Sequence, residues 1–277
     1  MTGKLLFKIP IPPCGEKNPG GDITVTEPAP QVYLMTITSG PDNRITTASV
    51  TAILDALDLL EFSPDKYPPG VLITTSGLPK FYSNGLDLEH ALATEDFMPT
   101  KLYKMFARFL TYPMPTVALI NGHAFAAGIM TAMHHDYRIM NPTRGFVCVN
   151  ELDFGVPLTA AMSSIFRIKT SPATYRKLLL EAHRFGGPEA VEAGIVDAVG
   201  GLDEALRFVA ERKLTQKPKS GIYGLLKSEM YRESMDLLCA EGHEREVKRV
   251  EANAVAEEER RAVGERRVGE IKGRAKL

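Results

Sequence analysis

Cysteine is scarce in this 277-residue chain, which has only Cys14, Cys148 and Cys239. The three residues lie far apart and form no C-x-x-C pair, which argues against both a disulfide framework and a zinc site. Such sparse usage is typical of a protein from a reducing compartment.

An excess of charge of one sign is also lacking. The formal net charge is −1, so no overall field favours nucleic acid or an anionic membrane surface.

The N-terminal apolar run is broken by Lys8 and then by Pro10, Pro12 and Pro13, which excludes a signal-peptide core or a membrane span there. Neither a G-x-S-x-G nucleophile elbow nor a G-x-x-x-x-G-K-[ST] phosphate loop occurs. We therefore expect a soluble protein without a membrane span or a nucleic-acid partner.

Apolar residues are plentiful, at 44% of the chain, and they supply enough material for a large core. Strand patterns at 32–38, 70–75 and 116–120 alternate with helical periodicity at 50–60 and 102–110. This alternation predicts an α/β fold.

The ends of the chain differ from this pattern. Residues 1–30 are rich in proline and glycine, which predicts an extended arm or a poorly ordered lead-in. We place the core at 31–215 and a helical tail at 216–277. The charged stretch from Glu241 carries Val247 and Val250 on a narrow apolar stripe, and we expect it to dock on its own domain or on a neighbouring subunit.

Two strand-to-helix turns are built around glycine, in residues 80–88 (KFYSNGLDL) and 121–130 (NGHAFAAGIM). The first N–H groups of a helix have no internal partner and lie at the positive end of the helix dipole. Two such groups can converge on one oxygen, which predicts an oxyanion hole.

These two turns, together with residues 136–138 (DYR) and 189–197 (EAVEAGIVD), resemble the crotonase superfamily. They are most similar to peroxisomal Δ3,Δ2-enoyl-CoA isomerases, and the resemblance runs from about residue 32 to residue 200. It implies an α/β spiral of ββα repeats, followed by helices that usually help to build a homotrimer or a hexamer. It also implies an acyl-CoA substrate, with coenzyme A entering as part of that substrate, and neither a retained cofactor nor a metal.

The resemblance places the two oxyanion donors on the backbone N–H groups of Leu86 and Ala127. It makes the surrounding residues a substrate-binding set: Ser83, Asn84, Gly85, Asp87 and Gly128. His123 is interpreted as packing or bonding locally beneath the second turn. Adjacent side chains on a helix point in different directions, which argues against a metal site at His134 and His135.

Glu151 matches the position of the catalytic glutamate of the family. Its apolar neighbours Phe146, Val149, Leu152 and Phe154 predict poor solvation, which raises a carboxyl pKa toward the range of a general base.

The second glutamate of the family's hydratases corresponds to Met130, and the additional aspartate of its dienoyl isomerases corresponds to Thr159. With one carboxylate left, the resemblance favours a double-bond shift from 3-enoyl-CoA to trans-2-enoyl-CoA in fatty acid β-oxidation. Two alternatives stay open: an enoyl-CoA hydratase or other crotonase reaction on a specialised acyl-CoA, and a non-catalytic acyl-CoA-binding or assembly protein.

The last three residues, Ala275, Lys276 and Leu277, are similar to the S-K-L address that the peroxisomal import receptor reads. They predict a peroxisomal location.

Overall fold

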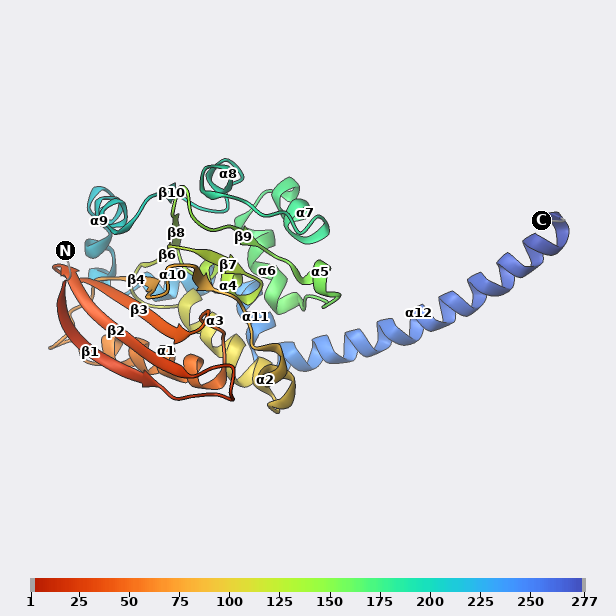
Figure 1. The fold of residues 1–277 in the computed structure, drawn as a ribbon, viewed down its shortest axis with the longest axis horizontal. Helices are drawn as coiled ribbons and strands as arrows, with labels where there is room; N and C mark the ends of the chain where they lie inside the picture. Colours follow the sequence, from red (N-terminus) through yellow and green to blue (C-terminus); the bar gives the residue numbers. More distant parts are fainter. Residues whose placement is uncertain (1–2, 276–277) are drawn as a thin grey trace.

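Two sheets form the centre of the computed structural model, which describes residues 3–275 (Figure 1). The larger has seven strands in the order β1-β2-β3-β4-β6-β8-β10. Its strands are β1 (Lys4–Ile11), β2 (Gly20–Ala29), β3 (Val32–Gly40), β4 (Val71–Ser76), β6 (Thr116–Ile120), β8 (Tyr137–Met140) and β10 (Ala198–Val199). β1, β2 and β3 pair antiparallel, and every later pair in this sheet is parallel.

The smaller sheet consists of three short parallel strands: β5 (Phe81–Ser83), β7 (His123–Phe125) and β9 (Val147–Cys148). Three successive repeats each place their first strand in the larger sheet and their second strand in the smaller one, as β4 with β5, β6 with β7, and β8 with β9. This is the predicted spiral of ββα repeats, and the α/β fold class is confirmed.

Helices cover both faces of the larger sheet. They are α1 (Thr47–Glu61), α2 (Leu88–Ala93), the π-helical turn η1 (Met98–Leu102), α3 (Tyr103–Leu110), α4 (Ala127–Met133), α5 (Glu151–Phe154), α6 (Ala160–Lys169), α7 (Pro172–Leu180), α8 (Gly187–Glu192), α9 (Leu202–Glu211), the 3₁₀ helix η2 (Leu214–Ser220), α10 (Tyr223–Met230), α11 (Arg232–Leu238) and α12 (Ala240–Ala275). α1, α3 and α4 pack into the main core, whereas α9 packs against the other face of β4, β6 and β8. Because both faces are covered, β4 is buried along its whole length.

Residues 4–29 form β1 and β2 rather than a poorly ordered lead-in, which corrects that expectation. Ile23 and Val25 of β2 are fully buried against the main core. Pro12, Pro13 and Pro19 lie between the two strands, and Pro10 lies on the edge strand β1, where its missing N–H is tolerated. The proline content therefore marks a turn and an edge, not disorder.

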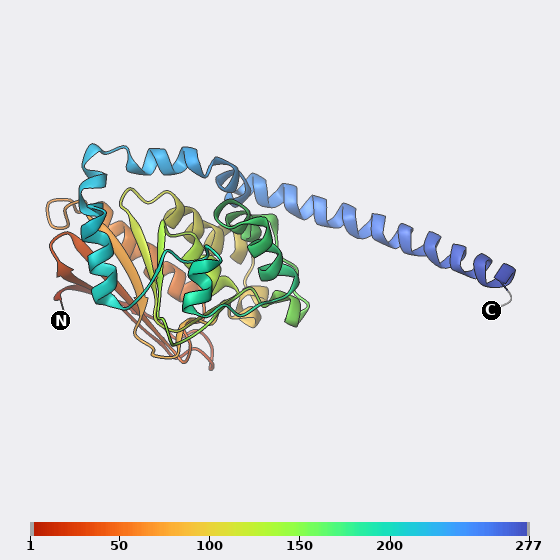
Figure 2. The same cartoon turned by 90° about the horizontal axis from the view of Figure 1, so that it is seen from above.

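The C-terminal tail is helical as predicted, but α12 extends away from the body (Figures 1 and 2). Among residues 3–275, the contacts of α12 with the rest of the chain are made by its first turns. The His243 ring meets Tyr103 edge-on at 5.8 Å, and Glu246 Oε1 accepts from the Ala160 N–H at 3.1 Å. Docking on its own domain is thus limited to the start of the helix.

Candidate active site

The carboxyl ends of β5, β7 and β9 meet at one edge of the small sheet, because the three strands are parallel. Leu86 follows the end of β5 at Ser83, Ala127 follows the end of β7 at Phe125, and Glu151 follows the end of β9 at Cys148. The spiral therefore brings the three positions singled out in the sequence to the same edge from three successive repeats.

Ser83 and Asn84 hold the first loop against residues 42 and 43. Ser83 Oγ donates to the Asn43 carbonyl at 2.8 Å and accepts from the Gly85 N–H at 3.2 Å. The Asn84 N–H donates to the Asp42 carbonyl at 3.0 Å, and Asn84 Nδ2 donates to Asp42 Oδ2 at 2.6 Å. Both side chains thus act within the protein, as loop anchors.

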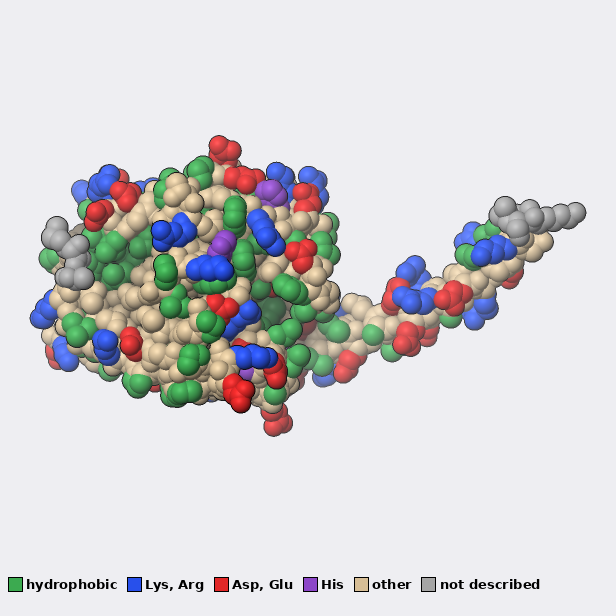
Figure 3. All heavy atoms as spheres, in the orientation of Figure 1, with side chains coloured by type: hydrophobic (Ala, Val, Ile, Leu, Met, Phe, Trp, Pro, Cys, Tyr) green, Lys and Arg blue, Asp and Glu red, His purple; other side chains and the backbone are tan. Residues whose placement is uncertain are grey.

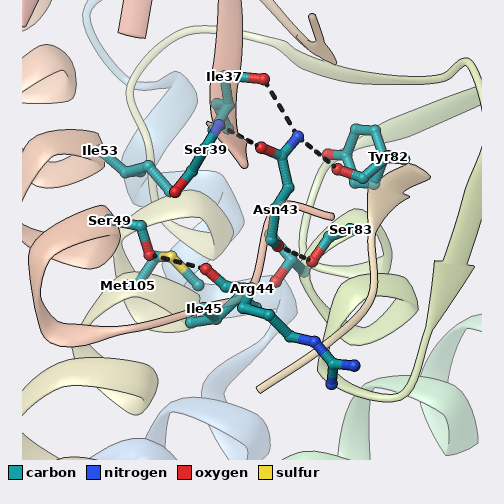
Figure 4. Close-up of a pocket in the computed structure, with 11 residues that line it drawn as sticks. Ile37, Ser39, Asn43, Arg44, Ile45, Ser49, Ile53, Tyr82, Ser83 and Met105 are labelled. Atoms are coloured by element: carbon teal, nitrogen blue, oxygen red, sulfur yellow. Dashed lines mark hydrogen bonds between the residues drawn. The ribbon is translucent and has the colours of Figure 1, made fainter. Parts of the chain in front are cut away.

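Asn43 is the buried centre of this anchor (Figure 4). Its Oδ1 accepts from the Ser39 N–H at 2.6 Å, and its Nδ2 donates to the Tyr82 carbonyl at 3.2 Å and to Ser76 Oγ at 2.7 Å. The side chain joins β3, β4 and β5 behind the first loop. No pattern in the sequence marked Asn43 for this role.

The cavity around Asn43 has a volume of about 30 Å³. That is room for about two water molecules, which is far too little for an acyl chain. Ser83 and Thr131 line it together with Asn43 (Figure 4). It lies behind the first loop.

The Leu86 N–H is free to face a ligand. The flanking groups bond to Ile45: the Ile45 N–H donates to the Gly85 carbonyl at 2.8 Å, and the Asp87 N–H donates to the Ile45 carbonyl at 3.2 Å. Leu86 lies between these two groups, and in such a parallel bridge its N–H points away from Ile45. Within residues 3–275 this N–H has no hydrogen-bond acceptor.

Asp87 caps α2 directly after this amide, with its Oδ1 accepting from the His90 N–H at 3.0 Å. Asp87 therefore orders the start of α2. Asn18 Nδ2 donates to Asp87 Oδ2, and Lys17 Nζ bonds Glu89 Oε2 at 2.8 Å. The turn between β1 and β2 therefore holds α2 in place, a contribution of residues 1–30 that sequence analysis missed.

The second loop has a strained residue immediately before the second predicted donor. Ala126 has φ 50° and ψ −124°, a conformation that residues with a β-carbon rarely adopt. Its N–H donates to the Cys148 carbonyl at 3.0 Å. The following N–H, that of Ala127, finds no acceptor among the described residues.

Glycine allows the two loops to touch. A β-carbon at Gly128 would lie 2.4 Å from the Ser83 carbonyl oxygen, and one at Gly85 would lie 3.3 Å from the Ala127 nitrogen. Gly85 also has φ +81°, where a side chain is unfavourable. Glycine at both positions is needed to bring the first predicted donor beside the second.

Glu151 is the first residue of the short helix α5, and its Oε2 atom is buried without a hydrogen-bond partner in residues 3–275. Desolvation by burial raises the pKa of this carboxyl to about 7. The surroundings differ from expectation, however. Leu152 and Phe154 are 56% and 71% exposed, whereas Val149 is buried.

His134 and His135 are fully buried packing residues. Their rings stack on Phe106 and Phe109 at 4.1 and 4.3 Å, and burial lowers the pKa of both imidazoles to about 3. His123 Nδ1 accepts from the Phe146 N–H at 3.1 Å, which confirms its local bond. No group of three or more His, Cys, Asp or Glu suited to a metal ion occurs in the described part of the chain.

Solved structures share this architecture. An enoyl-CoA hydratase from Mycobacterium marinum superposes with a TM-score of 0.68 at 21% identity, covering 83% of this chain and 98% of the other. An enoyl-CoA isomerase of Mtb superposes with a TM-score of 0.66, also at 21% identity, covering 78% and 93%. The two sheets and the helices around them are therefore those of the crotonase fold.

Sequence relatives then fix the family. The model of the enoyl-CoA hydratase/isomerase family matches residues 28–265, and the chain belongs to this family as an enoyl-CoA isomerase-like enzyme of the crotonase superfamily. It is 32% identical to Enoyl-CoA delta isomerase 3 of Arabidopsis thaliana, over 73% of this chain and 89% of that protein. It is 33% identical to the peroxisomal Enoyl-CoA delta isomerase 2 of the same plant, over 76% and 92%.

In residues 3–275 no helix is both long enough and apolar enough to cross a membrane.

Proposed function

We propose that this enzyme shifts the double bond of a 3-enoyl-CoA to give the trans-2-enoyl-CoA. Glu151 takes a proton from C2 of the thioester and returns it to C4, while the double bond moves from C3–C4 to C2–C3. The negative charge that develops on the thioester oxygen is met by the N–H groups of Leu86 and Ala127. No group is consumed, and coenzyme A enters and leaves as part of the acyl thioester.

The observation that carries this proposal is the buried Oε2 of Glu151, which has no hydrogen-bond partner in residues 3–275 and whose carboxyl has a pKa of about 7. A base with such a pKa is half ionised near neutral pH, which suits a group that must both accept and return a proton. The two N–H groups without acceptors support the second part, because fixed donors that face a developing oxyanion are each worth about 3 kcal/mol of barrier.

Two further positions support isomerisation over hydration. Met130, in the first turn of α4, is buried and has no group that could hold or activate water. Thr159 caps α6, accepting from the Met162 N–H at 3.2 Å and contacting the Tyr103 hydroxyl at 2.9 Å. Neither residue supplies a second carboxylate.

The test compares 3-hexenoyl-CoA with 2-hexenoyl-CoA. We expect formation of the 2-enoyl thioester from the first substrate to be faster than addition of water to the second. Faster hydration would contradict the proposal and favour a hydratase. Binding of both thioesters with turnover of neither would favour a non-catalytic acyl-CoA-binding protein.

We also propose a peroxisomal location and a role in fatty acid β-oxidation. Support comes from the C-terminal Ala275, Lys276 and Leu277 and from the name of the relative described as peroxisomal. Lys276 and Leu277 lie outside the described residues. The homotrimer or hexamer expected from the resemblance stays a prediction.

A further inference from the structure

The outer part of α12 forms a shaft that touches nothing else in the described chain. Every residue from 247 to 274 is exposed, and 28 residues of helix span about 42 Å. Figure 2 shows the shaft leaving the body, and Figure 3 shows acidic, basic and apolar side chains along it. It also contains Gly264, Gly269 and Gly273, each of which disfavours a helix by about 1 kcal/mol relative to alanine. Most helical stability in proteins comes from the packing of an apolar face, and among the described residues nothing packs on this shaft.

One stripe on the shaft has the spacing of a coiled-coil seam, alternating steps of three and four residues. Its members are Val247, Val250, Ala254, Glu257, Arg261, Gly264, Val268 and Ile271. The stripe is apolar at both ends, with Val250 54% and Ile271 50% exposed, and charged in the middle. A uniformly apolar partner would leave Glu257 and Arg261 without partners in the seam, so the occupant must carry matching charges.

The charges in the middle are segregated along the helix. Glu257, Glu258 and Glu259 are followed directly by Arg260 and Arg261. A parallel copy would place like charges opposite one another, which is destabilising. An antiparallel copy centred on Glu259 would place Glu257 opposite Arg261 in the seam.

We propose that α12 pairs with α12 of a second copy of this chain, antiparallel and centred on Glu259. In this register the remaining seam positions also match by type. The layers are Val247 with Ile271, Val250 with Val268, Ala254 with Gly264, and Glu257 with Arg261, each formed twice. The apolar ends become buried, and the small Ala254 and Gly264 let the two backbones approach.

The mass of the full-length protein, measured by light scattering over a concentration range, tests the seam. Val250→Lys and Val268→Lys should each weaken the α12-dependent association at least about tenfold, which is about 1.4 kcal/mol. Val255→Lys and Val263→Lys are the matched controls, because these valines are 59% and 55% exposed but lie outside the seam. Equal weakening by seam and control variants would overturn the proposal, as would no weakening by either.

A charge swap tests the orientation. Glu257→Arg alone places two arginines in each central layer and should weaken association at least about tenfold. Adding Arg261→Glu restores an acid–base pair in both layers and should recover an affinity within about threefold of the original. In a parallel pair, or on the body of another subunit, the second change would not rescue the first, and that result would overturn the antiparallel register. Circular dichroism of each variant checks that helix content is retained.

Discussion

The backbone N–H of Ala126 donates to the carbonyl oxygen of Cys148 at 3.0 Å. This bond joins the second glycine loop to the strand that leads to Glu151. It links the residue before one proposed oxyanion donor to a residue three positions before the proposed base. The backbone segments of two different repeats are thereby held together directly before both positions.

Replacing Glu151 by glutamine should lower kcat for the 3-enoyl thioester about 100- to 10,000-fold, the usual contribution of a positioned base. Binding of the substrate should be little changed. Asp153→Asn is the matched control, since this carboxylate lies in the same short helix but is exposed. Steady-state kinetics on both variants decide the matter, and full activity of Glu151→Gln would remove this residue from the mechanism.

Activity should depend on pH through the same carboxyl. Glu151 must be ionised to accept a proton, and its pKa is about 7. We therefore expect kcat/KM to rise about tenfold per pH unit below this value and to level off above it. A profile that is flat between pH 5 and pH 8 would show that another group, or no titrating group, takes the proton.

The free energy of unfolding should fall as the pH rises, whereas the activity should increase. The pKa of Glu151 is about 7 in the folded protein against an ordinary 4.5, so the unfolded chain loses this proton first as pH rises. The contribution of Glu151 to the free energy of unfolding is greatest below pH 4.5, falls by up to about 3 kcal/mol as the pH rises from 4.5 to about 7, and levels off above that.

Glutamine cannot lose a proton, so Glu151→Gln should be more stable than the original protein at pH 8 and similar to it at pH 4.5. Urea unfolding of both proteins at the two pH values measures the difference. The same gap at both pH values would mean that the burial of this carboxyl is without energetic cost.

Gly128→Ala should damage both the fold and the activity, because the new β-carbon would lie 2.4 Å from the Ser83 carbonyl oxygen. Overpacking of this kind costs about 1–3 kcal/mol, and the loops must separate to relieve it. Gly269→Ala is the control: nothing lies within 4 Å, and the helix should gain about 1 kcal/mol. Thermal unfolding and turnover of both variants are the measurements, and an unimpaired Gly128→Ala would show that close loop contact is not needed.

Deleting Leu277 should leave a fluorescently tagged protein in the cytosol, because the import receptor reads the end of the chain. Microscopy of the N-terminally tagged protein with and without this residue checks the expectation. Import of the truncated form would require another signal.

Much of the fold could be predicted from the sequence. The strand at Thr116–Ile120 and the helix at Thr47–Glu61 follow from apolar periodicity that is strong enough to read without a structure. β5 and β7 have only three residues each, too few for any period, and they appeared only as loop segments. Yet these short strands align the two glycine loops.

The candidate site was predictable only where motifs mark it. Glycine at 85 and 128 indicated the loops, because a close backbone approach leaves few other choices of residue. Asn43 and Asn18 could not be found in this way, since their bonds reach Tyr82 and Asp87 across long sequence separations. The exposure of Leu152 and Phe154 was likewise invisible, because a four-residue helix carries no readable pattern.

The spiral has a consequence for how such a protein can change. Each of three successive repeats delivers one short segment to the same edge of the small sheet, and each segment begins where a strand ends. Substitutions in the few residues after β9 can therefore change the chemistry at this edge. The backbone N–H groups of Leu86 and Ala127, which come from the two earlier repeats, would stay in place.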